Sequence, residues 1–372
     1  MGEFHMPKQV VGQPRYLKEV NQNIIDRLIT EKGPLTKPQI AQLTGLSLPT
    51  VNKIVDMLEA ENKVRSIGMT GNGVGRRAQL YQTNEDSGNV LTVYISQGCM
   101  TCCVVNMVGV VIYRFSVNLA GEMDATEALI TALERMNQNC IAPAVAIGIG
   151  LPGVVDEHGV VSCIPSIPQW EGVCLNKILA EKFNIPAYVE NNAKLTAIGF
   201  YNTQLKPKYR DVVYLHIGKG ISSGIILDTK LHKGFSSFAG ELGYMVLDHK
   251  SGRKEEGVGD LEQTLSQLIA DYRSEQHPVT AAQIRSDLFD CLAKVIVNYI
   301  CVINPEVVVL RGGVMTSDFL EDLKEKILSY VPERCMPQLM IDASEFSSIK
   351  GIVAACRQFI SPSLDIVEDG SI

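Results

Sequence analysis

The sequence predicts an α/β protein in which two lobes of alternating strands and helices follow a small N-terminal domain. Three segments before residue 62 carry apolar residues at helical spacing, and the second and third begin with capping residues, which predicts the small domain. From residue 89 short apolar strands alternate with helices, and a strand–turn–strand opening near Val90 is repeated near Val212, which indicates an internal duplication. We expect the boundaries 1–84 for the first domain, 88–195 (completed by a C-terminal helix at 350–361) for the first lobe, and 196–349 for the second lobe.

The composition is that of a globular protein, with 46% hydrophobic and 20% charged residues among 372. No apolar run reaches the ~18 residues that span a bilayer, and no leader pattern opens the chain, so we expect a cytoplasmic protein without a membrane segment. The ten cysteines are scattered, and Cys99 and Cys102 lack a second pair at zinc-finger spacing. We therefore predict reduced thiols, no metal and no cofactor.

The charge is unevenly distributed along the chain. Residues 1–83 hold 11 Lys and Arg against 7 Asp and Glu, a net charge of +4, whereas the remainder carries −11. The basic N-terminal domain is therefore a candidate for binding a polyanion.

The N-terminal domain follows a helix-turn-helix plan. After a helical pattern at 21–31, Thr36 and Gln39 form a capping box that opens a short helix ending at Gly45, and Ser47 caps a third helix at 48–61. The third helix has a buried stripe of Val51, Ile54, Val55 and Leu58. Three helices with a tight turn before the last are typical of DNA-binding domains.

Polar residues beside this stripe are placed to reach bases and phosphates in a major groove. Two short strands follow, at 64–68 and 79–82, joined by a glycine-rich loop that suits a wing whose arginines contact phosphate or a minor groove. The alternative is a protein-interaction module with a solvated basic loop. The predicted DNA-binding residues are Ser47, Thr50, Asn52, Lys53, Arg76 and Arg77, and the predicted partner is operator DNA.

The expected elements of the two lobes follow the chain in order. The first lobe contains strands at 90–96, 102–107 and 110–117, a helix at 125–137, a buried strand at 144–149 and a small hairpin at 154–161. The second contains a strand at 212–217, a glycine-rich turn at 218–224, a strand at 225–228, a helix at 294–303, a strand at 305–310, and closing helices at 317–331 and 350–360.

A strand at 185–189 ends in Glu190, Asn191 and Asn192, directly before a helical pattern. Open α/β sheets bind ligands at the carboxyl ends of their strands, so these polar groups predict a ligand site. The alternative is that the two asparagines only cap the helix.

Five motifs in order resemble the ROK family of repressors, open reading frames and sugar kinases. They are Gly150-Leu-Pro-Gly153, Glu190-Asn-Asn-Ala193, Gly218-x-Gly-Ile-x-x-Gly224, Gly240-Glu-Leu-Gly-Tyr244 and Asn304-Pro-Glu-x-Val-Val-Leu-x-Gly-Gly313. The resemblance implies an actin-like, hexokinase-type two-lobe ATPase fold, here with the winged helix-turn-helix domain of the family's regulators.

This chain departs from the kinases of that family where their chemistry occurs. The position of their catalytic Asp is Asn192, an amide that cannot accept a proton, and losing a general base costs about 10²- to 10⁴-fold. Residues 94–98 lack the acid and the paired glycines of the family's first phosphate loop. Tyr244 replaces a zinc-binding His, and 248–261 contains no cysteine. We expect neither catalysis nor zinc, and a solvated loop at 250–257.

This chain matches the family better at the positions that contact sugar than at the catalytic positions. Glu241 and Glu262 match its two hydroxyl-binding glutamates, and Asn191 matches its strand-end asparagine. Ser166 replaces an asparagine and Tyr244 a histidine, so the ligand can differ from the family's usual glucose or N-acetylglucosamine. The alternative for the glutamates is surface charge. Trp170, the only tryptophan, is expected in the core. The resemblance thus implies a sugar site made by Ser166, Asn191, Asn192, Glu241, Tyr244 and Glu262.

These observations predict a sugar-responsive transcription regulator, a repressor that acts as a homodimer or tetramer. Two heads must present helices about 34 Å apart to read successive major grooves. A residual sugar kinase with a regulatory head and a body that serves only as an oligomerisation scaffold are the alternatives.

Overall fold

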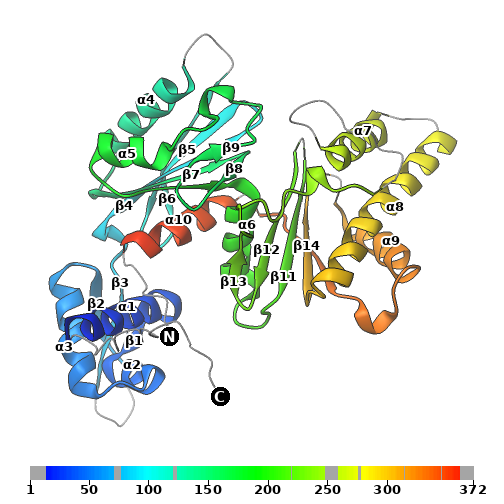
Figure 1. The fold of residues 1–372 in the computed structure, drawn as a ribbon. Coiled ribbons are helices and arrows are strands. Elements are labelled where there is room, and N and C mark those ends of the chain that lie inside the picture. Colours follow the sequence, from blue (N-terminus) through cyan, green and yellow to red (C-terminus); the bar gives the residue numbers. More distant parts are fainter. Residues whose placement is uncertain are drawn as a thin grey trace, which may run out of the picture.

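The computed structural model describes residues 14–70, 77–119, 124–218, 220–247, 259–274, 278–313, 315–344 and 346–360. A helical N-terminal domain precedes two lobes, each built around a five-stranded sheet (Figure 1). Within these ranges no helix combines the length and the apolar character needed to cross a membrane.

The N-terminal domain has the predicted three helices and a hairpin. The helices are α1 (Pro14–Lys32), α2 (Lys37–Thr44) and α3 (Leu48–Ala60), and the sheet consists of β1 (Leu35–Thr36), β3 (Gln79–Thr83) and β2 (Val64–Met69). α1 is longer than the predicted 21–31 because Pro14, which is well tolerated in a first turn, opens it. All four residues of the α3 stripe are buried, as predicted.

The first lobe is a sheet in the order β10 (Ala187–Asn191), β7 (Ala144–Leu151), β4 (Asn89–Ser96), β5 (Cys99–Asn106) and β6 (Val111–Asn118). Apolar residues of α4 (Ala125–Gln138) and α5 (Leu175–Phe183) pack on one face, and those of α6 (Asn192–Phe200) and α10 (Ser347–Ile360) on the other. The predicted hairpin is confirmed, because β8 (Val154–Val155) pairs with β9 (Val161–Ser162). Trp170 is fully buried in this core, as predicted.

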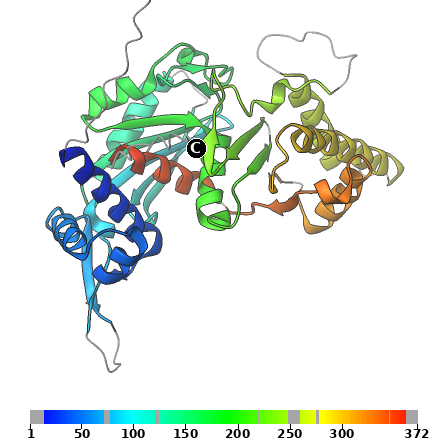
Figure 2. The ribbon, with the colours of Figure 1, turned by 60° about the horizontal axis from the view of Figure 1, so that its bottom comes forward.

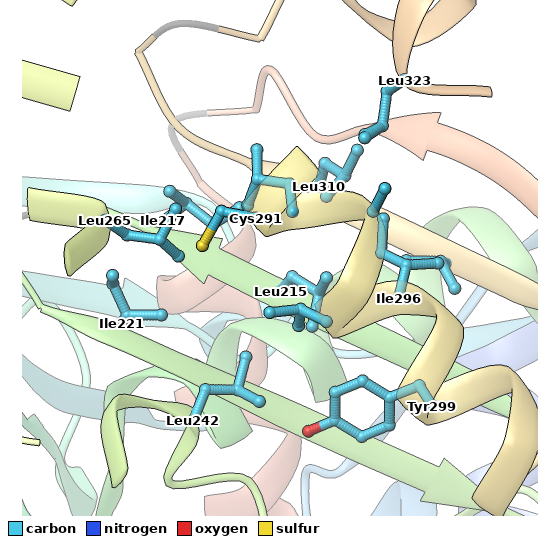
Figure 3. Packing of buried hydrophobic residues seen from close by; sticks show 14 of the residues in the cluster. Leu215, Ile217, Ile221, Leu242, Leu265, Cys291, Ile296, Tyr299, Leu310 and Leu323 are labelled. Carbon is cyan, nitrogen blue, oxygen red and sulfur yellow. The ribbon is translucent and has the colours of Figure 1, made fainter. Parts of the chain in front are cut away.

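The second lobe repeats this arrangement. Its sheet has the order β13 (Lys230–His232), β12 (Ile221–Leu227), β11 (Val212–Ile217), β14 (Val307–Arg311) and β15 (Gln338–Ile341). In both lobes an antiparallel meander of three strands is extended by two parallel strands, which is the pattern expected of a duplication. The helices α7 (Asp260–Ser274), α8 (Pro278–Val302) and α9 (Ser317–Leu328) cover one face and form the core shown in Figure 3.

The predicted glycine-rich turn at 218–224 is wrong. Only residues 218–220 connect the strands, because Ile221 to Gly224 pair with residues 214–217 of β11. A Cβ on Gly224 would lie 2.3 Å from Ala197 Cβ and 3.0 Å from the Ala193 carbonyl oxygen. This glycine is needed for the close approach of α6 to β12, a role that its sequence neighbourhood does not distinguish from turn formation.

The helices of the second lobe also differ from the expected ranges. α8 begins 16 residues before the predicted 294. Residues 282–287 in its first half are exposed or half-buried, and only the adjacent Leu288 and Phe289 are buried among the described side chains there, so the apolar signal in the sequence is weak. α9 ends at Leu328, shortly before Pro332, rather than at 331. α5 and α7 were not predicted.

α6 lies between the two sheets and contacts both (Figures 1 and 2). Ala197, Phe200 and Tyr201 pack against β11, β12 and β14, whereas Leu195 joins the cluster of α10 and the first sheet. The boundary expected between residues 195 and 196 falls inside this helix, and the division of the lobes at that point stays a proposal. The N-terminal end of α6 therefore lies where both lobes meet.

Candidate functional site

The caps of the N-terminal domain have the geometry that the sequence predicts. The Thr36 backbone N–H donates to Gln39 Oε1 at 2.8 Å, while the Thr36 hydroxyl accepts from the Gln39 N–H, which completes the capping box. Gly45 adopts φ 71°, and the Ser47 hydroxyl accepts from the Thr50 N–H at the start of α3. The turn that sets α3 against α2 is thus fixed by local hydrogen bonds.

The predicted DNA-binding residues of α3 lie on its outer side. Ser47, Asn52 and Lys53 are exposed and Thr50 is half-buried. Arg77 is exposed just before β3, and Arg76 lies outside the described residues. The paired strands β2 and β3 form the base on which a wing would stand. The contact of these residues with DNA stays a prediction.

Replacing Arg76 and Arg77 together by alanine should weaken operator binding and flatten its salt dependence. Each lost phosphate contact reduces the slope of log affinity against log salt concentration by about 0.9, because fewer counterions are released on binding. Binding measured between 50 and 300 mM KCl tests this, with Lys18→Ala on α1, which removes one positive charge outside the wing, as the control. An unchanged slope would rule out phosphate contacts by these arginines.

Asn191, the last residue of β10, does cap α6, as the simpler alternative proposed. Its side-chain oxygen accepts from the N–H groups of Ala193 and Lys194 at 2.8 and 3.3 Å. Its amide nitrogen, however, donates to the Gly153 carbonyl at 3.0 Å and to Glu241 Oε1 at 3.3 Å. The same side chain therefore orders the helix start and connects the first lobe to the second.

A second contact between the lobes is an ion pair at Glu190. This carboxylate is fully buried and lies 2.5 Å from the Lys233 ammonium, which belongs to the segment after β13. The Tyr188 hydroxyl and the Asn191 N–H also donate to Glu190, at 3.2 and 2.9 Å. Pairing and hydrogen bonds of this kind are what allow a carboxylate to stay buried.

Lys194, in the first turn of α6, is fully buried, and its ammonium donates to the Ser237 carbonyl. Burial lowers the pKa of Lys194, and the nearby Glu190 and Glu241 carboxylates oppose this shift. We call Glu190, Asn191, Lys194, Lys233 and Glu241 the interlobe cluster. Its contacts hold the segment 233–241 against β10 and α6.

The two glutamates expected to bind hydroxyl groups lie at the edge of this cluster. Burial raises the pKa of Glu241, and the neighbouring Glu262 and Glu190 carboxylates raise it further against the effect of Lys194. Burial also raises the pKa of Glu262, at the start of α7. Both side chains are only partly exposed, which argues against their being ordinary surface charge.

Asn192 lies at the carboxyl ends of β4 and β7. It is 6% exposed, and its amide nitrogen donates to the Ile95 carbonyl at 2.6 Å. A Cβ on Gly150 would come within 2.7 Å of Asn192 Oδ1, so the glycine leaves room for this side chain. Among the described residues, none donates a hydrogen bond to that oxygen.

The two remaining residues of the predicted sugar site lie at or beyond the edge of the interlobe cluster. Tyr244 is 39% exposed, and its ring lies 5.2 Å from that of Phe238. The Cys163 thiol, in the segment after β9, lies near the Tyr244 hydroxyl and Glu241; burial raises the pKa of this thiol, and the Glu171 and Glu241 carboxylates raise it further. Ser166 is exposed in the turn before Pro168, and no hydrogen bond within the described part of the chain joins it to the interlobe cluster.

The structure thus brings together Asn191, Glu241 and Glu262 and places Tyr244 beside them, whereas the Asn192 side chain contacts Ile95 and Gly150. Sequence reasoning missed the roles of Lys194 and Lys233. A signal for Lys194 exists, because it is the only charged residue in the largely apolar helix at 192–200. Nothing in the sequence near Lys233 indicates that it contacts Glu190.

No group of three or more His, Cys, Asp or Glu side chains within the described ranges is arranged to hold a metal ion. The segment 250–257, for which we expect a solvated loop, lies outside those ranges. The clustered carboxylates and amides can instead bridge pairs of hydroxyl groups, as recognition of a polyol requires.

A family model described as "ROK family" matches residues 95–357, and one described as "Winged helix-turn-helix DNA-binding" matches residues 19–65. The chain belongs to the ROK family. The first match spans both lobes, and the second covers the three-helix part of the N-terminal domain up to the start of β2.

The relatives include proteins named xylose repressor. That of Caldicellulosiruptor bescii is 30% identical over 246 residues, which are 64% of this chain and 61% of that protein. That of Bacillus spizizenii is 24% identical over 352 residues, 88% of this chain and 91% of that protein. A solved ROK family transcriptional regulator, described as a homologue of the E. coli MLC protein, has a TM-score of 0.78 at 20% identity and covers 93% of this chain and 98% of its own. That last likeness establishes the fold.

Proposed function

We propose that this chain is a sugar-responsive, DNA-binding transcription regulator, a repressor whose kinase-like body binds a sugar without phosphorylating it. The proposal rests mainly on one alignment. A relative named xylose repressor aligns with 88% of this chain, which includes parts of both the DNA-binding domain and the body. The exposed polar side of α3 and the polyol-type groups between the lobes support it.

The ligand is proposed to act through the contacts between the lobes. A ligand shifts a conformational equilibrium only by binding one state more tightly than the other. Glu241 belongs to one lobe and Asn191 to the other, so a sugar held by both would favour one lobe arrangement. Lobe movement would then alter the spacing of two heads in a homodimer or tetramer acting on operator DNA in the cytoplasm.

The purified protein should bind a DNA fragment from its own control region and change that affinity with one sugar. We would titrate DNA binding against D-xylose first, because of the relatives' names, and then against other pentoses, hexoses and disaccharides. Coupling between an effector and a second ligand typically changes affinity 5- to 150-fold, and about this range is expected. DNA binding that no sugar alters would contradict the regulatory role proposed for the body and would favour the scaffold alternative.

The alternative of a residual sugar kinase makes a different prediction. We expect no ATP-dependent phosphorylation of any pentose or hexose, because an amide occupies position 192. The Asn192→Asp variant should also remain inactive, since residues 94–98 still lack the acid and glycines that orient phosphate. A coupled ADP-release assay tests both proteins. Turnover that disappears in Glu241→Ala would establish the kinase instead.

A further inference from the structure

The N-terminal domain, or head, is joined to the first lobe by a short linker of residues 84–89, all of which the structure describes. The linker contains the 3₁₀ helix η1 (Glu85–Ser87) and leads from β3 of the head into β4 of the first lobe (Figure 1). Where such a segment is a flexible tether, the domains that it joins move independently. This linker is instead hydrogen-bonded on both sides, to the head and to the first lobe.

Asn84, which is buried, makes the connection to the head. Its amide nitrogen donates to the carbonyl and to the side-chain oxygen of Asn62, at 3.0 and 2.9 Å, and its backbone N–H donates to the Lys63 carbonyl at 2.8 Å. Asn62 and Lys63 form the turn directly after α3. Their own N–H groups donate to carbonyls of the last turn of that helix, those of Glu59 and Leu58, at 3.0 and 2.9 Å. The end of α3 is therefore tied to the first residue of the linker.

The same residue also holds the linker in its shape. Asn84 Oδ1 accepts from the Asp86 N–H at 3.3 Å, and the Asn84 carbonyl accepts from the Ser87 hydroxyl at 2.8 Å. Glu85 pairs with Arg65 of β2 at 2.8 Å, but both side chains are more than a third exposed, so this ion pair contributes little. The buried amide of Asn84 is the stronger connection, because its hydrogen bonds cannot be replaced by bonds to water without opening the linker.

The other end of the linker is fixed to the first lobe. The Glu85 carbonyl accepts from the Met107 N–H at 3.3 Å, in the turn between β5 and β6. The Arg357 guanidinium of α10 donates to the Met107 carbonyl. Asn89 has no exposed surface, and its Oδ1 accepts from the N–H groups of residues 141 and 142 at 3.0 and 3.1 Å. The linker thus bonds α3 to the first sheet and, through the turn between β5 and β6, to α10.

We propose that Asn84 is a positioning residue for operator recognition, which fixes α3 relative to the first lobe and so sets the half-site spacing that two heads can read. This rests on the proposed function, in which two heads of one oligomer bind together. Each base pair added between half-sites moves one of them by about 3.4 Å and turns it by about 35° around the duplex. A head that is bonded to its lobe cannot follow that rotation, whereas a tethered head can.

Binding of the full-length protein to DNA of varied half-site spacing tests this role. The half-site comes from the chain's own control region, and the duplexes carry one copy, two copies at the natural spacing, or two copies with one to five base pairs inserted. We expect the unaltered protein to lose at least about tenfold in affinity when two base pairs are inserted, because the second head no longer engages. Asn84→Ala should lose less than about threefold over the same change. It should bind the single copy as tightly as the unaltered protein does, which a variant that is merely unfolded would not do.

Asp156→Ala is the matched control for this experiment. Asp156 Oδ1 also accepts from two N–H groups of a turn, those of His158 and Val160 at 2.9 and 2.8 Å, but in the β8–β9 hairpin of the first lobe. This variant should keep the spacing preference of the unaltered protein. Equal losses in Asn84→Ala and the unaltered protein, or an unaltered protein that tolerates every spacing, would overturn the inference and leave the proposed function standing. Failure to bind any of the duplexes would overturn both.

A second variant and a measurement without DNA complete the test. Inserting two glycines between Ser87 and Gly88 leaves the bonds of Asn84 to the head in place but lengthens the connection by up to about 7 Å, so this variant should tolerate changed spacing as Asn84→Ala does. A sharp spacing preference in the insertion variant would contradict the role of the linker. In the unaltered protein the N–H groups of Asn84 and Met107 should exchange hydrogen at least about 100-fold more slowly than in an unstructured peptide. Exchange at the peptide rate would mean that the linker opens freely, and would overturn the inference.

Discussion

Gly351→Ala is expected to lower the free energy of unfolding of the body by about 3 kcal/mol, near the upper end of overpacking costs. A Cβ at this position would lie 1.7 Å from the Leu195 carbonyl oxygen, and one on Gly199 would lie 1.9 Å from the Ser347 carbonyl oxygen. Both clashes are with backbone, so α6 and α10 would have to separate. The gain of roughly 1 kcal/mol in helix propensity does not offset this.

Urea unfolding followed by the fluorescence of Trp170, which is buried in the first lobe, measures the effect. Gly218→Ala is the control, since a Cβ there meets its nearest atom, in the His216 ring, at 3.4 Å, an ordinary contact. If Gly351→Ala unfolded at the same urea concentration as the parent protein, the helices would not be in contact through these glycines.

Lys233→Met should destabilise the protein by about 3 kcal/mol and weaken the sugar response. The substitution leaves the Glu190 carboxylate, which has no exposed surface, without its ion-pair partner, and breaking a buried pair on one side costs about 3–5 kcal/mol. The lower value applies because Tyr188 and the Asn191 N–H still donate to Glu190. The response should weaken because Lys233 fixes the segment that carries Glu241.

A double-mutant cycle separates the pair from other effects. Glu190→Gln removes the charge with little change of shape, and the combined variant should recover about 2 kcal/mol relative to the sum of the single changes. Sugar binding of the four proteins is measured alongside unfolding. If the losses in the free energy of unfolding were strictly additive, the two side chains would act independently and the segment 233–241 would be held by other contacts.

Much of the N-terminal domain was predictable because its signals are local. A capping box joins residues that are three apart, and an apolar stripe is recognised within a single helix. Thr36, Gln39, Gly45 and Ser47 therefore mark the ends of α2 and the start of α3 without contacts from the rest of the chain. The strand-end position of Asn191 was visible for the same reason. Its capping bonds, to Ala193 and Lys194, are equally local.

The sequence by itself determined the helix order of the N-terminal domain, the strand–turn–strand opening of each lobe and the polar residues gathered at the end of β10. Only the tertiary structure decided that Lys233 pairs with Glu190, that Lys194 is buried under Ser237, and that Gly224 serves helix packing rather than a turn. These contacts join segments about 30 to 45 residues apart. They depend on how two sheets meet around α6, and no local periodicity carries that information.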